Sequence, residues 1–224
     1  SFGSLGGRAI RALNEGARQG GLAHDTGEGG ISVHHLHGGD LIWEIGSGYF
    51  GCRARDGRFD ADRFADEAAR PEVKMIEIKL SQGAKPGHGG MLPAAKITPA
   101  IAAARGIPMG EDCISPPHHT AFDDPVGLLE FVARLRELSG GKPTGFKLCI
   151  GHAWEFAAVV KAMLTTGLRP DFIVIDGKEG GTGAAPLELL NRMGTPLTDG
   201  LIFARNMLIG AGLRPHIRLG ASGK

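Results

Sequence analysis

The stretch from Met75 to Gly90 constrains the fold more than any other part of the sequence. Its first half, Ile76-Glu77-Ile78-Lys79-Leu80, alternates apolar and charged residues with the two-residue period of a β-strand. Its second half is a polar, glycine-rich loop that contains Gln82 and Lys85. Because α/β folds place their chemistry at the carboxyl ends of parallel strands, this loop is the first candidate for a functional site.

The same succession of strand, glycine-rich loop and helix recurs about every 30 to 40 residues, which is the rhythm of a parallel sheet covered by helices. The predicted strands are Leu22–Asp25, Leu41–Ile45, Met75–Ser81, Gly145–Ile150, Phe172–Ile175 and His216–Leu219. The predicted helices are Arg8–Gln19, with Ser4 as its cap, Asp60–Arg70, Thr98–Arg105, Pro125–Leu138, Trp154–Leu164 and Pro196–Leu213. Between the third and fourth helix, Cys113–His119 is predicted to be a rigid connector.

Two architectures fit this rhythm, and the charges on the predicted strands favour one of them. An open doubly wound sheet buries both strand faces, whereas the inner face of a closed barrel can hold Lys79, Lys147 and Arg218 around a ligand. A complete barrel has eight strands and about 250 residues, and this sequence supplies at most seven, the first of them truncated. We therefore expect an α/β fold, a (β/α)8 TIM-type barrel that is incomplete at both ends, as one domain over residues 1–224.

Composition narrows the class of partner. With 42% hydrophobic and 22% charged residues the chain can bury a sizeable core, and its net charge of +1 provides no basic field for nucleic acid. A small-molecule substrate is favoured. The sequence has three cysteines and no Cys-x-x-Cys pair, which indicates neither a disulfide framework nor a zinc site, so we expect a cytoplasmic protein. We also expect no membrane span, because no apolar run is long enough. The open edges of an incomplete barrel favour an oligomer.

Five short segments, spread in order over the chain, carry a specific pattern. They are Ser1–Ser4, Thr26–Gly30, Lys79–Gly87, Ser115–His119 and Gly180–Ala184. Together they resemble the FMN-binding synthase domain of the glutamate synthase family. The resemblance implies a (β/α)8 barrel whose FMN takes electrons and reduces the imine formed from 2-oxoglutarate and ammonia, which gives glutamate.

The resemblance and the residue chemistry together give a set of expected site residues. The residues expected to bind FMN are Ser4, Lys79, Gln82, Lys147, Gly180, Gly181, Thr182 and Gly183. The residues expected to bind substrate are Glu28, Tyr49, Ser81 and Lys85, of which Glu28 and Lys85 are also expected to be catalytic.

Each role has a chemical reason. A fixed cation at Lys147 would stabilise the anionic reduced flavin at its N1 and O2 edge, and Gln82 can donate and accept toward the pyrimidine. Glu28 can hold an ammonium or iminium group, while Lys85 can pair with a substrate carboxylate. The alternatives are a structural pair of Lys147 with Glu77, a loop cap at Gln82, and solvated loop charges at Glu28 and Lys85.

The chain also departs from the family pattern. Tyr49 stands where glutamate synthases proper carry an arginine associated with the substrate carboxylate, so a related reaction, such as the formation of N-methylglutamate, is the alternative. The cysteines for the family's iron–sulfur cluster lie outside this chain, and the glutaminase domain is absent from it. The resemblance therefore implies an electron-donor protein or a glutaminase subunit as partner.

Three alternative hypotheses about the function are compatible with the sequence. Histidines at positions 34, 35, 37, 118 and 119 are candidate metal ligands, but neighbouring histidines seldom point the same way and we expect no metal site. The chain is alternatively a non-catalytic barrel fragment that serves as an assembly subunit. The third reading is a flavin-free lyase that uses Lys147 or Lys79 as a Schiff base.

Overall fold

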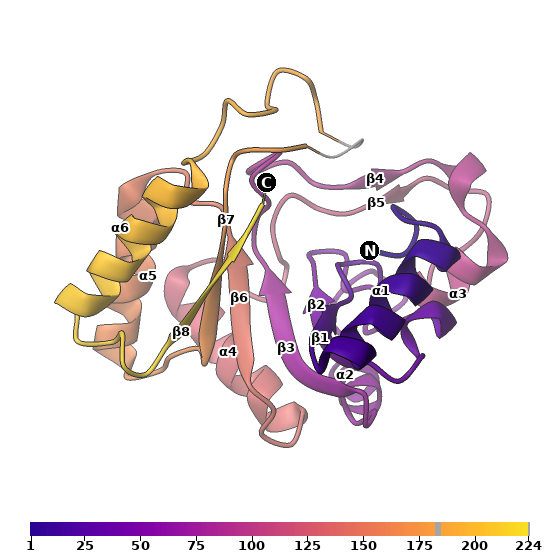
Figure 1. Ribbon diagram of the computed structural model, residues 1–224, viewed down its shortest axis with the longest axis horizontal. Coiled ribbons are helices and arrows are strands. Elements are labelled where there is room, and N and C mark those ends of the chain that lie inside the picture. The colour runs from indigo at the N-terminus through magenta and orange to yellow at the C-terminus, as the bar shows by residue number, and fades with distance from the viewer. Residues whose placement is uncertain (182–184, 224) are drawn as a thin grey trace. The chain divides into compact units, whose positions relative to one another are not determined.

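The computed structural model describes residues 1–181 and 185–223 (Figure 1). The chain divides into two compact units. Unit 1 comprises Ser1–Glu77, Gly89–Thr120 and Arg136–Lys142, and unit 2 comprises the rest of the chain. The expectation of one partial barrel domain over residues 1–224 stays a prediction.

Within the described residues, one parallel sheet contains six strands. They hydrogen-bond in the order β1 (Ala23–Asp25), β2 (Asp40–Ile45), β3 (Val73–Lys79), β6 (Thr144–Leu148), β7 (Phe172–Asp176) and β8 (Arg218–Ser222). This spatial order is the sequence order, without the reversal that defines a doubly wound sheet. Each strand is added at the same edge, as in a (β/α)8 barrel, so the predicted fold class is confirmed, and six strands agree with the expected maximum of seven.

Unit 1 holds β1, β2, the larger part of β3 and three helices: α1 (Gly7–Gly20), α2 (Ala61–Ala68) and α3 (Pro99–Arg105). Asn14 is fully buried on the inner side of α1. Its side-chain oxygen accepts the backbone N–H groups of His37 at 2.9 Å and Gly39 at 3.1 Å, which ties α1 to the loop before β2. The helix N-cap is Gly6 and not Ser4, because Ser4 lies in a turn that precedes the helix and its side chain is exposed.

The sequence did not reveal one further part of unit 1. Strands β4 (Met91–Leu92) and β5 (Cys113–Ile114) pair in antiparallel fashion, and β5 lies in the segment predicted to be a connector. Two short 3-10 helices, η1 (Val33–His35) and η2 (Ala94–Lys96), also belong to unit 1. Elements of two or three residues are too short for a periodic pattern, so neither period-two nor helical signals could reveal them.

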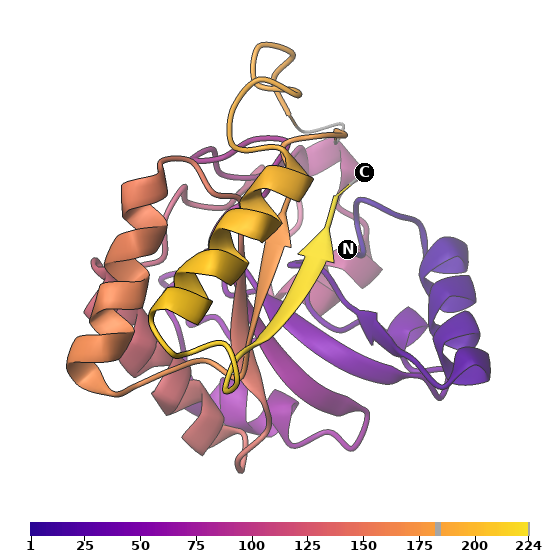
Figure 2. The same ribbon diagram turned by 60° about the vertical axis from the view of Figure 1, so that its left-hand side comes forward.

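Unit 2 contains the end of β3, strands β6 to β8, and the helices α5 (Ala153–Thr166) and α6 (Leu197–Gly210), together with most of α4 (Pro125–Leu138). The predicted apolar stripe of α4 is buried, namely Leu128, Leu129, Val132 and Leu135. Figure 2 shows α6 lying in front of β7 and β8, with α5 beside it. Arg218 begins β8 opposite Phe172 and is exposed, and its expected place around a ligand on the inner face of a barrel stays a prediction.

Two compositional expectations can be compared with the structure. Cys52, Cys113 and Cys149 are buried and form no disulfide with one another, as expected. Burial raises the pKa of the Cys52 and Cys149 thiols, so both side chains are poor nucleophiles. In residues 1–181 and 185–223, no helix has the length and apolar character that a membrane span requires.

The buried histidine of η1 makes the stability of unit 1 sensitive to acid. His35 is fully buried, and its Nδ1 accepts the backbone N–H of Ser32 at 3.0 Å. Burial is the main cause that lowers the pKa of His35 to about 4, and the neighbouring His24 is the second. The unfolded chain therefore binds a proton at this residue in a pH range where the native chain does not.

We predict that the free energy of unfolding is highest above about pH 6.5 and falls by roughly 3 kcal/mol as the pH drops toward about 4. Urea unfolding at a series of pH values measures this. The variant His35→Phe cannot take up the proton and should lose less stability over the same range, whereas the control His216→Phe, at an exposed site, should behave as the wild type. An identical pH dependence in His35→Phe and wild type would contradict the assignment.

Candidate functional site

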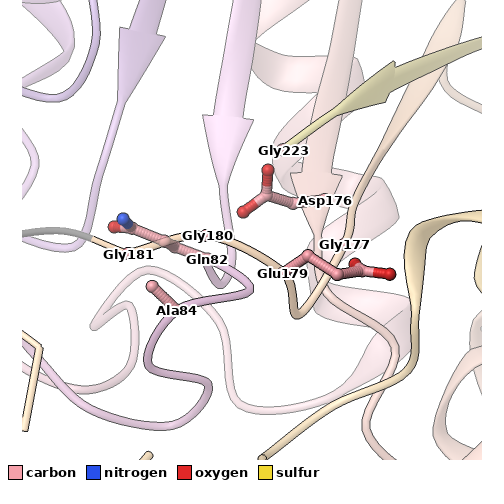
Figure 3. Close-up of a pocket in the computed structure, with 8 residues that line it drawn as sticks. All are labelled: Gln82, Ala84, Asp176, Gly177, Glu179, Gly180, Gly181 and Gly223. Carbon is pink, nitrogen blue, oxygen red and sulfur yellow. The ribbon is translucent and has the colours of Figure 1, made fainter. Parts of the chain in front are cut away.

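The carboxyl ends of β3, β7 and β8 surround a pocket of about 290 Å3 in unit 2 (Figure 3). The residues that line it are Gln82, Ala84, Asp176, Gly177, Glu179, Gly180, Gly181 and Gly223. They come from the loop after β3, the loop after β7 and the end of β8. This is the edge of a parallel sheet where α/β proteins bind ligands, so it is the candidate site of unit 2.

Asp176, the last residue of β7, ties three strand ends together. One carboxylate oxygen accepts the backbone N–H of Gly83 at 2.6 Å, and the other accepts the hydroxyl group of Ser222 at the end of β8. A Cβ atom at Gly83 would overlap the carbonyl oxygen of Gly177, so only glycine allows this close approach of the two loops. The loop after β3 is therefore held directly against the loop after β7.

Glu179 is the second carboxylate of the pocket, and its position is also fixed. Its two oxygen atoms lie 3.2 and 3.0 Å from the backbone nitrogen of Leu197, the first residue of α6, whose N–H group they accept. Sequence reasoning assigned no role to Asp176 or Glu179. The available signal was a pair of carboxylates in a glycine-rich loop directly after a buried strand.

Two of the predicted cofactor-binding lysines lie side by side. The backbone N–H of Leu80 donates to the carbonyl oxygen of Lys147 at 2.9 Å, which in a parallel pair places Lys79 next to Lys147 with both side chains on the same face. Both lysines are half-buried. The ammonium group of Lys79 donates to the side-chain oxygen of Gln82 at 3.0 Å. This bond fixes the orientation of the Gln82 amide, whose N–H groups can still donate to another acceptor.

The glycine-rich loop after β7 was expected to present backbone N–H groups to an anion. The N–H of Gly180 donates instead to the side-chain oxygen of Asn191 at 2.9 Å. Gly181 lines the pocket. Thr182 and Gly183, which belong to the same expectation, lie outside the described residues.

Lys85 lies in the loop after β3, as predicted, whereas Ser81, predicted as the last residue of the strand, belongs to that loop because β3 ends at Lys79. The hydroxyl group of Ser81 accepts the N–H of Cys149 at 2.9 Å and lies 3.3 Å from the carbonyl oxygen of the same residue, so it joins the end of β3 to the end of β6. The backbone N–H of Lys85 donates to the carbonyl oxygen of Gln82 at 3.1 Å, and its side chain is buried, with 6% exposed.

In unit 1, Glu28 follows β1 and lies against two glycines. A Cβ atom added at Gly46, directly after β2, would lie 2.6 Å from one carboxylate oxygen of Glu28. A Cβ atom at Gly90 would lie 3.4 Å from the other oxygen and 3.4 Å from the hydroxyl group of Ser115. The glycines thus leave the space that the Glu28 carboxylate occupies.

Tyr49 is fully buried in unit 1 with a φ angle of 49°, a conformation that is uncommon for a residue other than glycine. Its hydroxyl group accepts the backbone N–H of Thr120 at 3.1 Å and lies 3.2 Å from Nδ1 of His119. The rings of Tyr49 and His119 also meet edge to face. Tyr49 therefore fastens the loop after β2 to the segment that ends at Thr120.

Unit 1 also contains a cluster of carboxylates that sequence reasoning did not identify. Asp25, Glu44 and Glu77 each offer one oxygen atom, and these atoms all lie within 4.8 Å of one another. They come from the neighbouring strands β1, β2 and β3. No pattern in the sequence indicates this cluster, because it forms only when the three strands pair.

The candidate histidines point to different partners. The ring of His34 packs against Phe2, His35 bonds to Ser32, His37 lies 3.9 Å from a carboxylate oxygen of Glu15, and His119 bonds to Tyr49. These separate contacts agree with the expectation that neighbouring histidines do not converge.

Comparison with known proteins assigns the chain to a family. Residues 1–224 match the family described as conserved region in glutamate synthase. The glutamate synthase large subunit-like protein YerD of Bacillus subtilis is 42% identical over the whole chain, which covers 43% of that relative. An archaeal-type glutamate synthase [NADPH] of Thermotoga neapolitana is 35% identical over 96% of the chain and 39% of its own length. The glutamate synthase [NADPH] large chain of Bacillus subtilis is 34% identical over the whole chain, which covers 14% of it. The chain therefore belongs to the glutamate synthase family.

Proposed function

We propose that this chain forms the flavin-binding part of a glutamate synthase-like oxidoreductase, which uses FMN to reduce the imine of a 2-oxo acid and ammonia to an amino acid. The observation that carries the proposal is the family match over residues 1–224. The chain spans about two fifths of the length of the first relatives, 43% and 39%.

The residues of unit 2 suit a flavin ring. The neighbouring side chains of Lys79 and Lys147 supply positive charge on one face of the sheet, and Lys79 orients the amide of Gln82 so that its N–H groups remain available to an acceptor. The pyrimidine edge of a flavin carries such acceptors, and its reduced form carries negative charge there. Bound FMN would supply hydride transfer, and the two lysines would stabilise the anionic reduced ring.

The proposed roles on the substrate side fall to residues in the loops that follow strands. Glu28 is proposed to hold the ammonium or iminium group, and Lys85 to pair with a carboxylate of a 2-oxo acid such as 2-oxoglutarate. Tyr49 is proposed to affect substrate choice through the segment that it holds at His119 and Thr120. The alternative substrate is an N-methylated amine, as in N-methylglutamate formation.

The names of the relatives suggest an electron source. Two of them are named for NADPH, so we propose that electrons come from a reduced nicotinamide through an electron-donor protein or domain. An iron–sulfur cluster, if the route uses one, would need residues outside this chain. A glutaminase subunit is the proposed source of ammonia.

The cofactor can be tested directly. Denaturation of the purified protein should release FMN, identified by its absorption spectrum and by chromatography against riboflavin and FAD. A protein that releases no FMN, and that binds none when FMN is added to it, would overturn the proposed function.

We predict that Lys147→Met makes the midpoint potential of the bound flavin more negative by about 30 mV or more, because the methionine keeps the aliphatic length and removes only the charge. For a two-electron couple this corresponds to a tenfold loss of affinity for the reduced flavin relative to the oxidised form. Spectroelectrochemical titration measures it, with Lys161→Met, an exposed lysine of α5, as the matched control. Equal potentials in wild type and Lys147→Met would assign Lys147 a structural role.

We predict that Gly46→Ala lowers kcat roughly 10- to 100-fold, because the new Cβ atom displaces the Glu28 carboxylate from its position. The flavin content should not change. Gly16→Ala in α1, where an added Cβ meets no atom within 4 Å, is the control and should keep full activity. If Gly46→Ala retains wild-type kcat, the position of Glu28 does not matter for the reaction.

A further inference from the structure

The side chains of the pocket at the carboxyl ends of β3, β7 and β8 offer more hydrogen-bond acceptors than donors. Its charged side chains are the carboxylates of Asp176 and Glu179, and the described residues that line it include no lysine or arginine. The side-chain donor on its wall is the amide of Gln82, whose oxygen atom already accepts from Lys79.

Four backbone donors in and beside the glycine-rich loop of the pocket are already used. Among the lining residues, Gly177 donates its N–H to the carbonyl oxygen of Ser222 at 3.0 Å, and Gly180 donates to Asn191 at 2.9 Å. The neighbouring Gly83 donates to Asp176 at 2.6 Å, and Lys178 donates to the carbonyl oxygen of Thr195 at 3.1 Å. Free backbone N–H groups are what a glycine-rich loop normally offers a phosphate, and these four are engaged with the chain's own acceptors.

The two carboxylates retain capacity to accept more hydrogen bonds. Each carboxylate has about four lone-pair sites. Asp176 accepts from Gly83 and Ser222, and Glu179 accepts from Leu197. A phosphate group in this pocket would meet two fixed negative charges, whereas hydroxyl groups would find fixed acceptors for their protons.

We propose that this pocket binds the hydroxyl-bearing chain of the flavin, with hydroxyl groups that donate to Asp176 and Glu179, and that the cofactor phosphate is bound elsewhere. The inference rests on the proposed function, since it takes a flavin to be the ligand. The pocket volume of about 290 Å3 lies at the lower limit of whole-ligand sites, roughly 300 to 1,000 Å3. It therefore suits one section of a cofactor rather than the whole.

Three flavins that contain different sections of the cofactor test the contribution of each section to binding. Lumiflavin has the ring alone, riboflavin adds the hydroxyl-bearing chain, and FMN adds the phosphate. The affinity of the apoprotein for each is measured by fluorescence titration in wild type and in Glu179→Gln, which keeps an oxygen atom to accept the N–H of Leu197 and loses the charge. We expect the preference for riboflavin over lumiflavin to fall roughly 3- to 30-fold, because a charged acceptor becomes a neutral one. The ratio of FMN to riboflavin affinity should not change.

The control is Glu155→Gln, which removes a carboxylate that bonds to the backbone N–H of His152 at the start of α5 and does not line the pocket. It should leave all three affinities unchanged. If Glu179→Gln fails to fold, Asp176→Asn takes its place, since an amide oxygen can still accept from Gly83.

Two results would overturn the inference while the proposed function stands. An unchanged preference for riboflavin over lumiflavin would mean that the pocket does not hold the hydroxyl-bearing chain. A gain in FMN affinity alone, without a change for riboflavin, would place the phosphate beside Glu179. A wild-type protein that binds none of the three flavins would instead remove the proposed function itself.

Discussion

The arrangement of unit 2 depends on the carboxylate of Asp176. This carboxylate accepts hydrogen bonds from the loop after β3 and from the end of β8, and Asp176 is itself the last residue of β7. A carboxylate that accepts two donors in a partly buried place holds them more firmly than a neutral acceptor would. The consequence is that the walls of the pocket are fixed relative to the strand ends before a ligand binds, which lowers the ordering cost of binding.

Charge is separated within unit 2. Lys79 and Lys147 lie side by side on one face of the sheet, where β3 pairs with β6, whereas Asp176 and Glu179 line the pocket at the ends of β3, β7 and β8. A flavin has an edge that becomes negative on reduction and a chain of neutral hydroxyl groups, so the two kinds of environment suit two parts of the same cofactor. This pairing of residue chemistry with cofactor chemistry supports the proposal that FMN is the cofactor, independently of the family match.

Much of the fold could be predicted from the sequence, because long periodic segments such as Pro125–Leu138 and the buried strand Phe172–Asp176 carry their own signal. The short antiparallel pair β4 and β5 could not, since two-residue strands have no period. Lys79, Gln82 and Lys147 could be proposed as site residues from the sequence, because they alternate with apolar strand residues or closely follow them. Asp176 and Glu179 were not assigned a role, because their hydrogen-bond partners are distant in sequence and only the folded chain reveals them.

The central claim is that Lys79 and Lys147, which share one face of the sheet, keep the reduced flavin anionic. The most direct measurement is the pH dependence of the midpoint potential of the bound flavin in mildly acidic buffer. Uptake of one proton with two electrons gives a slope of about 30 mV per pH unit, which is the result that an anionic reduced flavin predicts. A slope of about 59 mV per pH unit would mean that the reduced flavin binds two protons and is neutral, and would contradict the claim.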